Sequence, residues 1–400
     1  MRSVLFTKDD ESKIAYLITV MFSYNVVTLT FNSFVNLIFP NTPFDTALCM
    51  LAYAYFIMRA IKPIASRINV ADVLFVFFCA FVYLASMFVL PDNREYLEFK
   101  CFDFLVKILP FYLVGRAVGD YEKLLNCLVR ASKYVVFIGF AYYLLTILSG
   151  RELIKDNMAF AYYYLPFAIL SIYSLVKSFT PMALLRVGVS IGTLVLAGTR
   201  GPFVCIAVAL VAFTVIYQKS KVAKVLLSAG IIALGMFMLS ERFTEMLESI
   251  NDFLLQHDIE NRIIEKFLED EMADSSGRDK IVDSILSALQ ERPFTGYGLM
   301  GDRAFADGIY AHNIFYELIA SYGWFFGTGL FIAVTLIVVR AVLSHKASSS
   351  YRAVAIFVVS YIFVKLFLSS SFLLEPAFFL MLGIVFNFER RKEENDGLRN

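Results

Sequence analysis

The sequence predicts an all-α, polytopic integral membrane protein with about twelve transmembrane helices and one long extracytoplasmic loop. Of its 400 residues, 59% are hydrophobic and 16% are aromatic, and the mean hydropathy is +0.67. Soluble domains are typically about 45–50% apolar. The apolar residues gather in runs that are long enough to cross a bilayer, and only one long segment, 241–311, is polar.

A transmembrane helix needs roughly 17–25 residues. The predicted spans, in chain order, are 14–39, 44–60, 70–90, 102–118, 128–149, 158–177, 181–198, 202–218, 222–240, 313–339, 351–369 and 372–388. Only Gly198-Thr199-Arg200-Gly201-Pro202 separates the seventh span from the eighth, and proline suits the first turn of a helix. The chain therefore divides into nine helices over 1–240, the loop 241–311, three helices over 312–390 and a tail, 391–400.

Lysine and arginine are distributed unequally between alternate connections. One set holds Arg59, Lys62, Arg67, Arg116, Lys123, Arg130, Lys133, Lys177, Lys219, Lys221, Lys224, Arg340, Lys346, Arg352 and the cations of both termini. The other set holds only Arg94, Lys100, Arg151, Lys155 and Arg200 in its short loops. The positive-inside rule places both termini in the cytoplasm, and it places Arg200, the loop 241–311 and His312 outside it.

Several kinds of site have no signature in the chain. The sequence has no basic tract for nucleic acid, no P-loop, no dinucleotide-binding glycine pattern and no G-x-S-x-G. Its five cysteines are scattered, without metal-ligand spacing. We therefore expect no cofactor, no metal ion and no nucleic-acid partner.

The long polar segment contains two helical patterns. Apolar residues at helical spacing between Ile259 and Leu268 predict an amphipathic helix. Ser276 with Asp279 is a helix-start signal, the apolar positions from Ile281 to Leu289 form one face, and Pro293 ends the second helix. The segment is therefore a structured part of the protein.

Two arginines lie at predicted helix starts on the extracytoplasmic side. Arg278 is in the first turn of the second loop helix, and Arg200 precedes Pro202. Arg278 could be a solvated charge or a partner of Asp279 or Glu291, and Arg200 could reach the membrane interface by snorkelling. Alternatively, the guanidinium groups and helix N–H groups bind a phosphate-bearing ligand.

His312 is the one histidine of three that lies where a polar loop meets a predicted membrane helix. It is either a structural residue or a base that accepts a proton near neutral pH, because its ordinary pKa is about 6.5. Lys107, Lys365 and Glu375 lie within or beside apolar runs, where charge is costly. They either line a substrate cavity, or Lys365 and Glu375 pair across a short turn.

These motifs resemble the O-antigen ligase/polymerase (Wzy and WaaL) superfamily. The matching features are G-T-R-G-P at Gly198–Pro202, the helix with Arg278, P-F-T-G-Y-G at Pro293–Gly298 and H-N-x9-G at His312–Gly323. One departure is Gly323-Trp324-Phe325-Phe326-Gly327-Thr328-Gly329, one residue longer than the G-x-x-G-T-G of many ligases.

The resemblance implies a GT-C-like, metal-independent glycosyltransferase in the bacterial inner membrane, with its active site facing the periplasm. Its donor would be a glycan on undecaprenyl pyrophosphate. Arg200 and Arg278 would hold the pyrophosphate, and His312 would deprotonate the acceptor hydroxyl. The other candidate substrate contacts are Arg303, Tyr297, Asn313, Lys107 and Lys365. Membrane lipids and a polysaccharide chain-length regulator are further candidate partners.

Three functions remain open on the sequence. A polymerase of lipid-linked repeat units is favoured. The first alternative is a ligase that transfers glycan to lipid A–core. The second is a transporter or flippase of lipid-linked glycan, although no internal repeat of the kind many transporters carry is visible.

Overall fold

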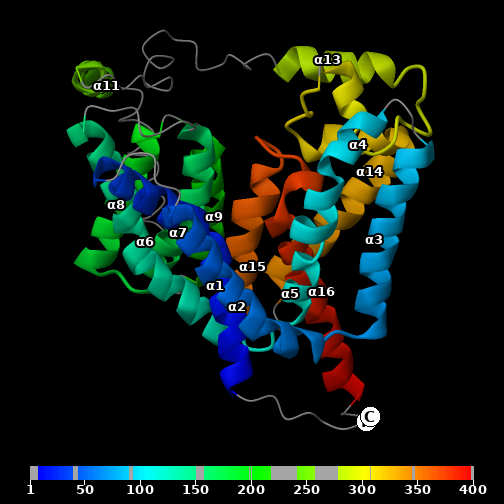
Figure 1. The fold of residues 1–400 in the computed structure, drawn as a ribbon, viewed down its shortest axis with the longest axis horizontal. Coiled ribbons are helices and arrows are strands. Elements are labelled where there is room, and N and C mark those ends of the chain that lie inside the picture. Colours follow the sequence, from blue (N-terminus) through cyan, green and yellow to red (C-terminus); the bar gives the residue numbers. More distant parts are fainter. Residues whose placement is uncertain are drawn as a thin grey trace. The chain divides into compact units, whose positions relative to one another are not determined.

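Every regular element in the described part of the chain is helical (Figure 1). The computed structural model describes residues 8–38, 44–89, 93–149, 157–197, 199, 201–217, 241–256, 278–306, 308–344 and 347–397. Within these ranges, six helices are long and apolar enough to cross a membrane, and four more are apolar but shorter. The prediction of an all-helical, polytopic membrane protein is thus confirmed. The count of about twelve spans stays a prediction, since 222–240 lies outside the described residues.

The chain divides into two compact units. Unit 2 comprises 15–59 and 122–274. Its helices are most of α1 (Lys8–Ile38) and α2 (Phe44–Ala65), then α6 (Tyr121–Ser149), α7 (Asn157–Lys177), α8 (Pro181–Leu196), α9 (Gly201–Tyr217) and α11 (Glu241–Leu255). Helix α7 packs against both α8 and α9 and is buried over most of its surface. A helix that is apolar all round suits this central position.

Unit 1 comprises 1–14, 60–121 and 275–400. Its elements are α3 (Val70–Val89), α4 (Arg94–Phe102), η2 (Asp103–Ile108), α5 (Phe111–Arg116), α13 (Arg278–Ala288), η4 (Gly301–Phe305), α14 (Ile314–Leu343), α15 (Ser349–Val358), η5 (Val359–Phe363), η6 (Phe372–Leu374) and α16 (Pro376–Gly397). The predicted span 102–118 is one part of a longer helical run that starts at Arg94 and changes register near Pro110.

The connections of unit 1 gather at two opposite ends of α3. At one end, Arg67 pairs with Glu11 at 2.9 Å and donates to the Ala117 carbonyl at 2.6 Å. At the other end, the Asn93 amide donates to the carbonyls of Tyr297 and Leu299, at 2.6 and 3.1 Å. The charge pattern likewise groups the connections near Arg67 and Arg116 with the N-terminus, and the connection near Arg94 with the loop 241–311. The side of the membrane that each end faces remains a prediction. We call the first end the Asp72 end, because Asp72 lies in the first turn of α3, and the second the His312 end.

The predicted span 313–339 lies within one of these six candidates, Ile314–Leu343, but its helix is not continuous. Helix α14 breaks at Gly323, where φ is 76° and ψ is 173°. A Cβ on Gly327 would lie 2.6 Å from the Ile319 Cα, so the segments on either side of Gly323 fold sharply against each other. In a straight helix these two residues would be about 12 Å apart. Hydropathy did not reveal the break because both segments are apolar.

Candidate functional site

The break in α14 frees backbone carbonyls, and the turn Pro293–Gly298 binds them. Tyr297 N–H donates to the Ala320 carbonyl at 2.8 Å, and Gly298 N–H donates to the Ser321 carbonyl at 2.8 Å. In return, Trp324 N–H donates to the Pro293 carbonyl at 2.7 Å. Gly296 is required here, since its φ is 63° and a Cβ would lie 2.5 Å from the Gly323 nitrogen. The turn and the helix break therefore form one rigid junction.

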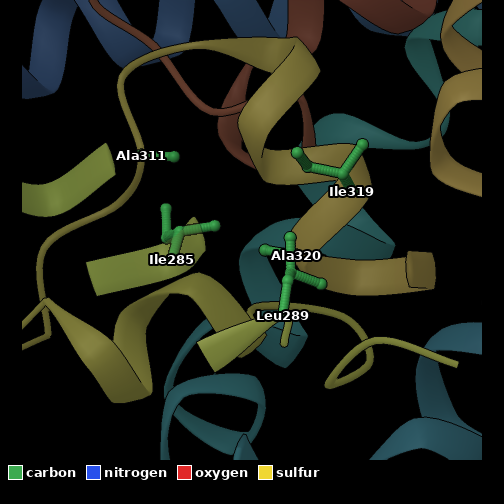
Figure 2. Close-up of a cluster of buried hydrophobic side chains, with 5 residues drawn as sticks. All are labelled: Ile285, Leu289, Ala311, Ile319 and Ala320. Atoms are coloured by element: carbon green, nitrogen blue, oxygen red, sulfur yellow. The ribbon is translucent and has the colours of Figure 1, made fainter. Parts of the chain in front are cut away.

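Helix α13 packs on this junction. It begins at Arg278, which confirms the helix start predicted near Ser276. A cluster of buried apolar side chains joins α13 to the first segment of α14 and to the residue before His312 (Figure 2). Its members are Ile285, Leu289, Ala311, Ile319 and Ala320. The cluster fixes α13 relative to the chain at His312.

Arg278 is the first residue of α13, and its Cα lies about 10 Å along the helix from that of Ile285. The Arg278 side chain lies outside the described residues, as do Arg200 and the predicted helix 259–268. The start of α13 therefore lies about 10 Å along the helix from Ile285, a member of the buried cluster that includes Ala311.

His312 has a positive φ, which is uncommon for residues other than glycine, although histidine, asparagine and aspartate adopt it more often than most. Its φ is 55°, in the left-handed region. Contacts hold the chain on both sides: Ala311 N–H donates to Asp302 Oδ2 at 2.7 Å, and Ile314 N–H donates to the Leu366 carbonyl at 2.8 Å. The His312 ring also lies 4.1 Å from the Tyr310 ring, between centroids. Such over-determined, strained residues are found disproportionately at functional sites.

Two of the predicted substrate contacts hold this region together. Asn313 caps α14, with its Oδ1 accepting from Phe315 N–H at 2.9 Å. The Tyr297 hydroxyl donates to the Ala288 carbonyl at 2.7 Å, at the end of α13. Desolvation, followed by the nearby Glu291 carboxylate, raises the pKa of Tyr297, so the hydroxyl stays protonated and donates at neutral pH. Each of these polar groups has a partner within the protein.

Arg303, a further predicted sugar or phosphate contact, lies inside a buried charge cluster. Its side chain is 5% exposed, between Asp302 at 0% and Glu317 at 1%. Arg303 Nη1 donates to Asp302 Oδ1 at 2.9 Å, and Nη2 donates to Ser371 Oγ at 3.2 Å. Ser371 Oγ donates to Glu317 Oε1, and Phe372 N–H donates to Glu317 Oε2 at 3.1 Å. In this arrangement the guanidinium binds protein groups.

Asp302 has opposing influences on its ionisation. Burial raises the pKa of its carboxyl, whereas the Arg303 guanidinium and the N–H of Ala311 act in the opposite direction. The cluster holds two carboxyl groups and one guanidinium, and burying ionisable groups is costly unless each is paired or neutralised.

The two candidate lysines form ion pairs. Lys365 Nζ pairs with Glu375, whose carboxylate also accepts from Ser370 Oγ at 3.2 Å. Of the two alternatives for Lys365, the pair across a turn is therefore present. Lys107 pairs with Asp103 at 2.7 Å, one turn earlier, and remains largely exposed.

The sequence interpretation missed Asp302, Glu317, Ser371 and Tyr310. One signal was available: Glu317 is a charged residue inside the predicted span 313–339, where an ionisable side chain is expensive. Another was the adjacent pair Asp302-Arg303, a few residues before His312. No group of three or more His, Cys, Asp or Glu residues that could hold a metal occurs among the described residues.

Comparison with known protein families finds a match over part of the chain. Residues 185–332 match the Wzy_C family model, which is described as O-antigen ligase. The match covers Arg200, Arg278 and His312, and it supports the Wzy/WaaL-like resemblance, with lipid-linked glycans as the implied substrates. No curated protein matches the chain. The domain supports a membrane enzyme of O-antigen or surface-polysaccharide assembly.

Proposed function

We propose that this chain, which carries a domain of the O-antigen ligase/polymerase superfamily, is a polymerase that joins lipid-linked oligosaccharide repeat units into a surface polysaccharide. The donor is a glycan on undecaprenyl pyrophosphate, and the acceptor is the sugar end of another lipid-linked unit. The reaction takes place on the extracytoplasmic face of the inner membrane, where the charge pattern predicts that His312 lies.

In the proposed reaction, the His312 imidazole accepts the proton of the acceptor hydroxyl as its oxygen attacks the anomeric carbon of the donor. The bond from that carbon to the pyrophosphate oxygen breaks, and the electron pair leaves with undecaprenyl pyrophosphate. A single displacement of this kind inverts the anomeric centre. A histidine suits the task because its ordinary pKa lies near the working pH.

Arg200 and Arg278 have the second role. Negative charge grows on the pyrophosphate as the bond breaks, and a guanidinium group can bind phosphate oxygens with two parallel hydrogen bonds. The N-terminus of α13, where Arg278 lies, adds free N–H groups and a partial positive charge. Two permanent positive charges would supply the neutralisation that a metal ion provides in other glycosyltransferases.

The observation that supports this proposal most strongly is the position and backbone conformation of His312. It lies within the matched domain, and contacts on both sides hold it in a left-handed backbone conformation. The residue before it, Ala311, belongs to the buried cluster that holds α13.

The surface glycan of a deletion strain tests the proposal. Lipopolysaccharide, or capsule if that is the product, is separated on a gel from wild-type, deleted and complemented strains. A polymerase predicts lipid A–core with one repeat unit and no ladder in the deletion, and complementation restores the ladder. An unchanged profile would contradict the proposal.

A ligase is the second candidate, because the matching family model is described as O-antigen ligase. A ligase would transfer finished glycan from undecaprenyl pyrophosphate to lipid A–core. The same gel distinguishes it: the deletion strain would show bare core while long glycan accumulates on the lipid carrier.

The topology completes the proposal. Both termini would be cytoplasmic, the loop 241–311 would be periplasmic, and a chain-length regulator would be a membrane partner. Single cysteines at Asp279 and at Ser348, in a background without the five native cysteines, would test the two sides. A membrane-impermeant thiol reagent applied to intact spheroplasts should label position 279 and spare position 348.

A further inference from the structure

The buried charge cluster Asp302–Arg303–Ser371–Glu317 is connected to the chain on both sides of His312. At one end, Asp302 Oδ2 accepts from the N–H of Ala311, the residue before His312, at 2.7 Å. At the other end, Glu317 lies in the first turn of α14, which begins two residues after His312. A continuous series of hydrogen bonds joins the two ends through Arg303 and Ser371.

We propose that this cluster positions His312, with Asp302 as the principal positioning residue. This inference rests on the proposed function, in which His312 is the base. Asp302 does not touch the substrate in this account. It acts through the Ala311 N–H and through Arg303, which transmits the constraint to Ser371 and Glu317.

Burying this cluster is costly. Cluster members are nearly inaccessible to solvent, and two carboxyl groups face one guanidinium. Well-packed apolar side chains often stabilise a protein as well as a buried ion pair does, so stability alone does not account for the cluster. Fixing one backbone geometry does account for it, because hydrogen bonds are directional and apolar contacts are not.

The strained backbone supplies the second argument. A residue at φ 55° returns to a commoner conformation unless its neighbours prevent it. The Asp302 contact fixes the peptide between Tyr310 and Ala311, whereas Glu317 fixes Phe372 and Ser371 against the first turn of α14. Tyr310 reinforces the arrangement: its ring lies against that of His312, and its hydroxyl donates to the Ser369 carbonyl at 3.2 Å.

The test compares Asp302→Asn with Asp72→Asn. Both substitutions neutralise a buried aspartate that binds an arginine in unit 1, but Asp72 lies at the opposite end of α3, bound to Arg116 at 2.5 Å. The side-chain oxygen of an asparagine at 302 could still accept from the Ala311 N–H. Its NH₂ group would then face the Arg303 guanidinium, where the attraction to a carboxylate would be lost. The full-length protein is purified in detergent, and rates are expressed per folded molecule.

Two readouts are used. The first is the joining rate on lipid-linked repeat units extracted from the deletion strain. The second is the modification rate of each histidine by diethyl pyrocarbonate, resolved by mass spectrometry. The chain has only three histidines, so His257 and His345 are internal references. This readout does not depend on activity.

Asp302→Asn should lower kcat about 10- to 100-fold and change KM less than about threefold. A displacement of the catalytic histidine by about 1 Å can lower the reaction rate by up to about 100-fold. The His312 modification rate should change at least about threefold, with the other two histidines unaffected. Asp72→Asn should change neither readout. Wild-type kcat and wild-type His312 modification in Asp302→Asn would overturn the proposal.

If Asp302→Asn does not fold, the same two readouts are measured on Ser371→Ala. It removes the hydroxyl between Arg303 and Glu317 without changing any charge. A kcat about 3- to 10-fold lower with altered His312 modification supports the proposal, and no change in either overturns it. The proposed function fails separately: full activity of His312→Asn would remove its role as base, while the modification rates would still report whether the cluster fixes its position.

Discussion

Unit 1 buries an aspartate–arginine pair at each end of α3, and the two pairs differ in what they hold. At the Asp72 end, Asp72 accepts from Arg116 Nε at 2.5 Å and exchanges capping hydrogen bonds with Asn69 at the start of α3. At the His312 end, Asp302 shares Arg303 with a second carboxyl group and accepts from the N–H of Ala311, the residue before a histidine with positive φ. The first pair joins α3 to α5, whose residues have ordinary helical backbone angles. The second lies beside His312, whose positive φ is held by contacts with neighbouring residues.

The comparison separates stability from function. A one-to-one pair that caps a helix and joins α3 to α5 has a sufficient structural explanation. The Asp302 cluster differs because it also binds the chain next to a histidine in the left-handed conformation, a contact that joining helices does not require. We therefore expect substitutions at the Asp72 end to alter unfolding and substitutions at the His312 end to alter catalysis.

The largest effect is expected from His312→Asn. Asparagine tolerates the left-handed conformation, so the backbone should be retained while the base is lost. The joining rate should fall about 10²- to 10⁴-fold, as is common when a general base is removed. Quantitative gels of the surface glycan, with protein levels measured in parallel, would detect this loss, and a retained ladder at normal expression would contradict it.

The next effect is expected from Asp72→Asn, on stability alone. Arg116 would remain buried without its counter-charge, which costs about 3 kcal/mol. Unfolding of the purified protein in mixed micelles should shift by that free energy, while the rate per folded molecule should match wild type. A catalytic defect without a shift in unfolding would reverse the assignment of the two ends.

A smaller loss of stability is expected from Gly323→Ala. A Cβ at this position would lie 2.6 Å from the Pro293 oxygen and the Phe294 carbon, and the backbone conformation is itself nearly restricted to glycine. We expect a cost of about 2 kcal/mol. The single tryptophan, Trp324, is the next residue, so its emission should report the disturbed junction.

Gly329→Ala is the matched control for that substitution. Gly329 lies in the second segment of α14, and nothing lies within 4 Å of a Cβ built there. Alanine should leave both the stability and the Trp324 emission near wild type. Equal destabilisation by the two substitutions would mean that the break at Gly323 is not the source of the effect.

The smallest effect is expected from Arg278→Lys. Lysine keeps the charge and loses the planar, two-pronged hydrogen bonding to phosphate, so activity should fall about tenfold. Lys280→Ala serves as the control, because Lys280 is an exposed cation on the same helix. Assays with extracted lipid-linked repeats would measure both, and equal activities of the two variants would argue against a specific phosphate contact by Arg278.

The parts of the fold that depend on short-range pattern were predictable. Apolar length identified the membrane helices, and the signal at Ser276 located the start of α13 within two residues. The Lys365–Glu375 pair was one of two alternatives, and both residues lie close together in sequence. Periodicity and local charge carry this information directly.

The missed features depend on long-range contacts and on backbone angles. Arg303 meets Ser371 across 68 residues of sequence, so no local pattern indicates that the guanidinium is already bound within the protein. The break at Gly323 leaves no trace in hydropathy, although a glycine in the H-N-x9-G motif was a hint. The sequence shows an ionisable residue, Glu317, inside an apolar run, where it is energetically unfavourable. That signal alone points to a buried polar partner and so to the cluster.

The central claim is that this chain joins lipid-linked repeat units and that His312 is its base. The most direct measurement incubates the purified protein with extracted lipid-linked repeats and measures glycan length by mass spectrometry. The account predicts lipid-linked products of two or more repeats from the wild-type protein and none above background from His312→Asn. Equal product from both proteins, or no elongation by a folded wild-type protein, would contradict it.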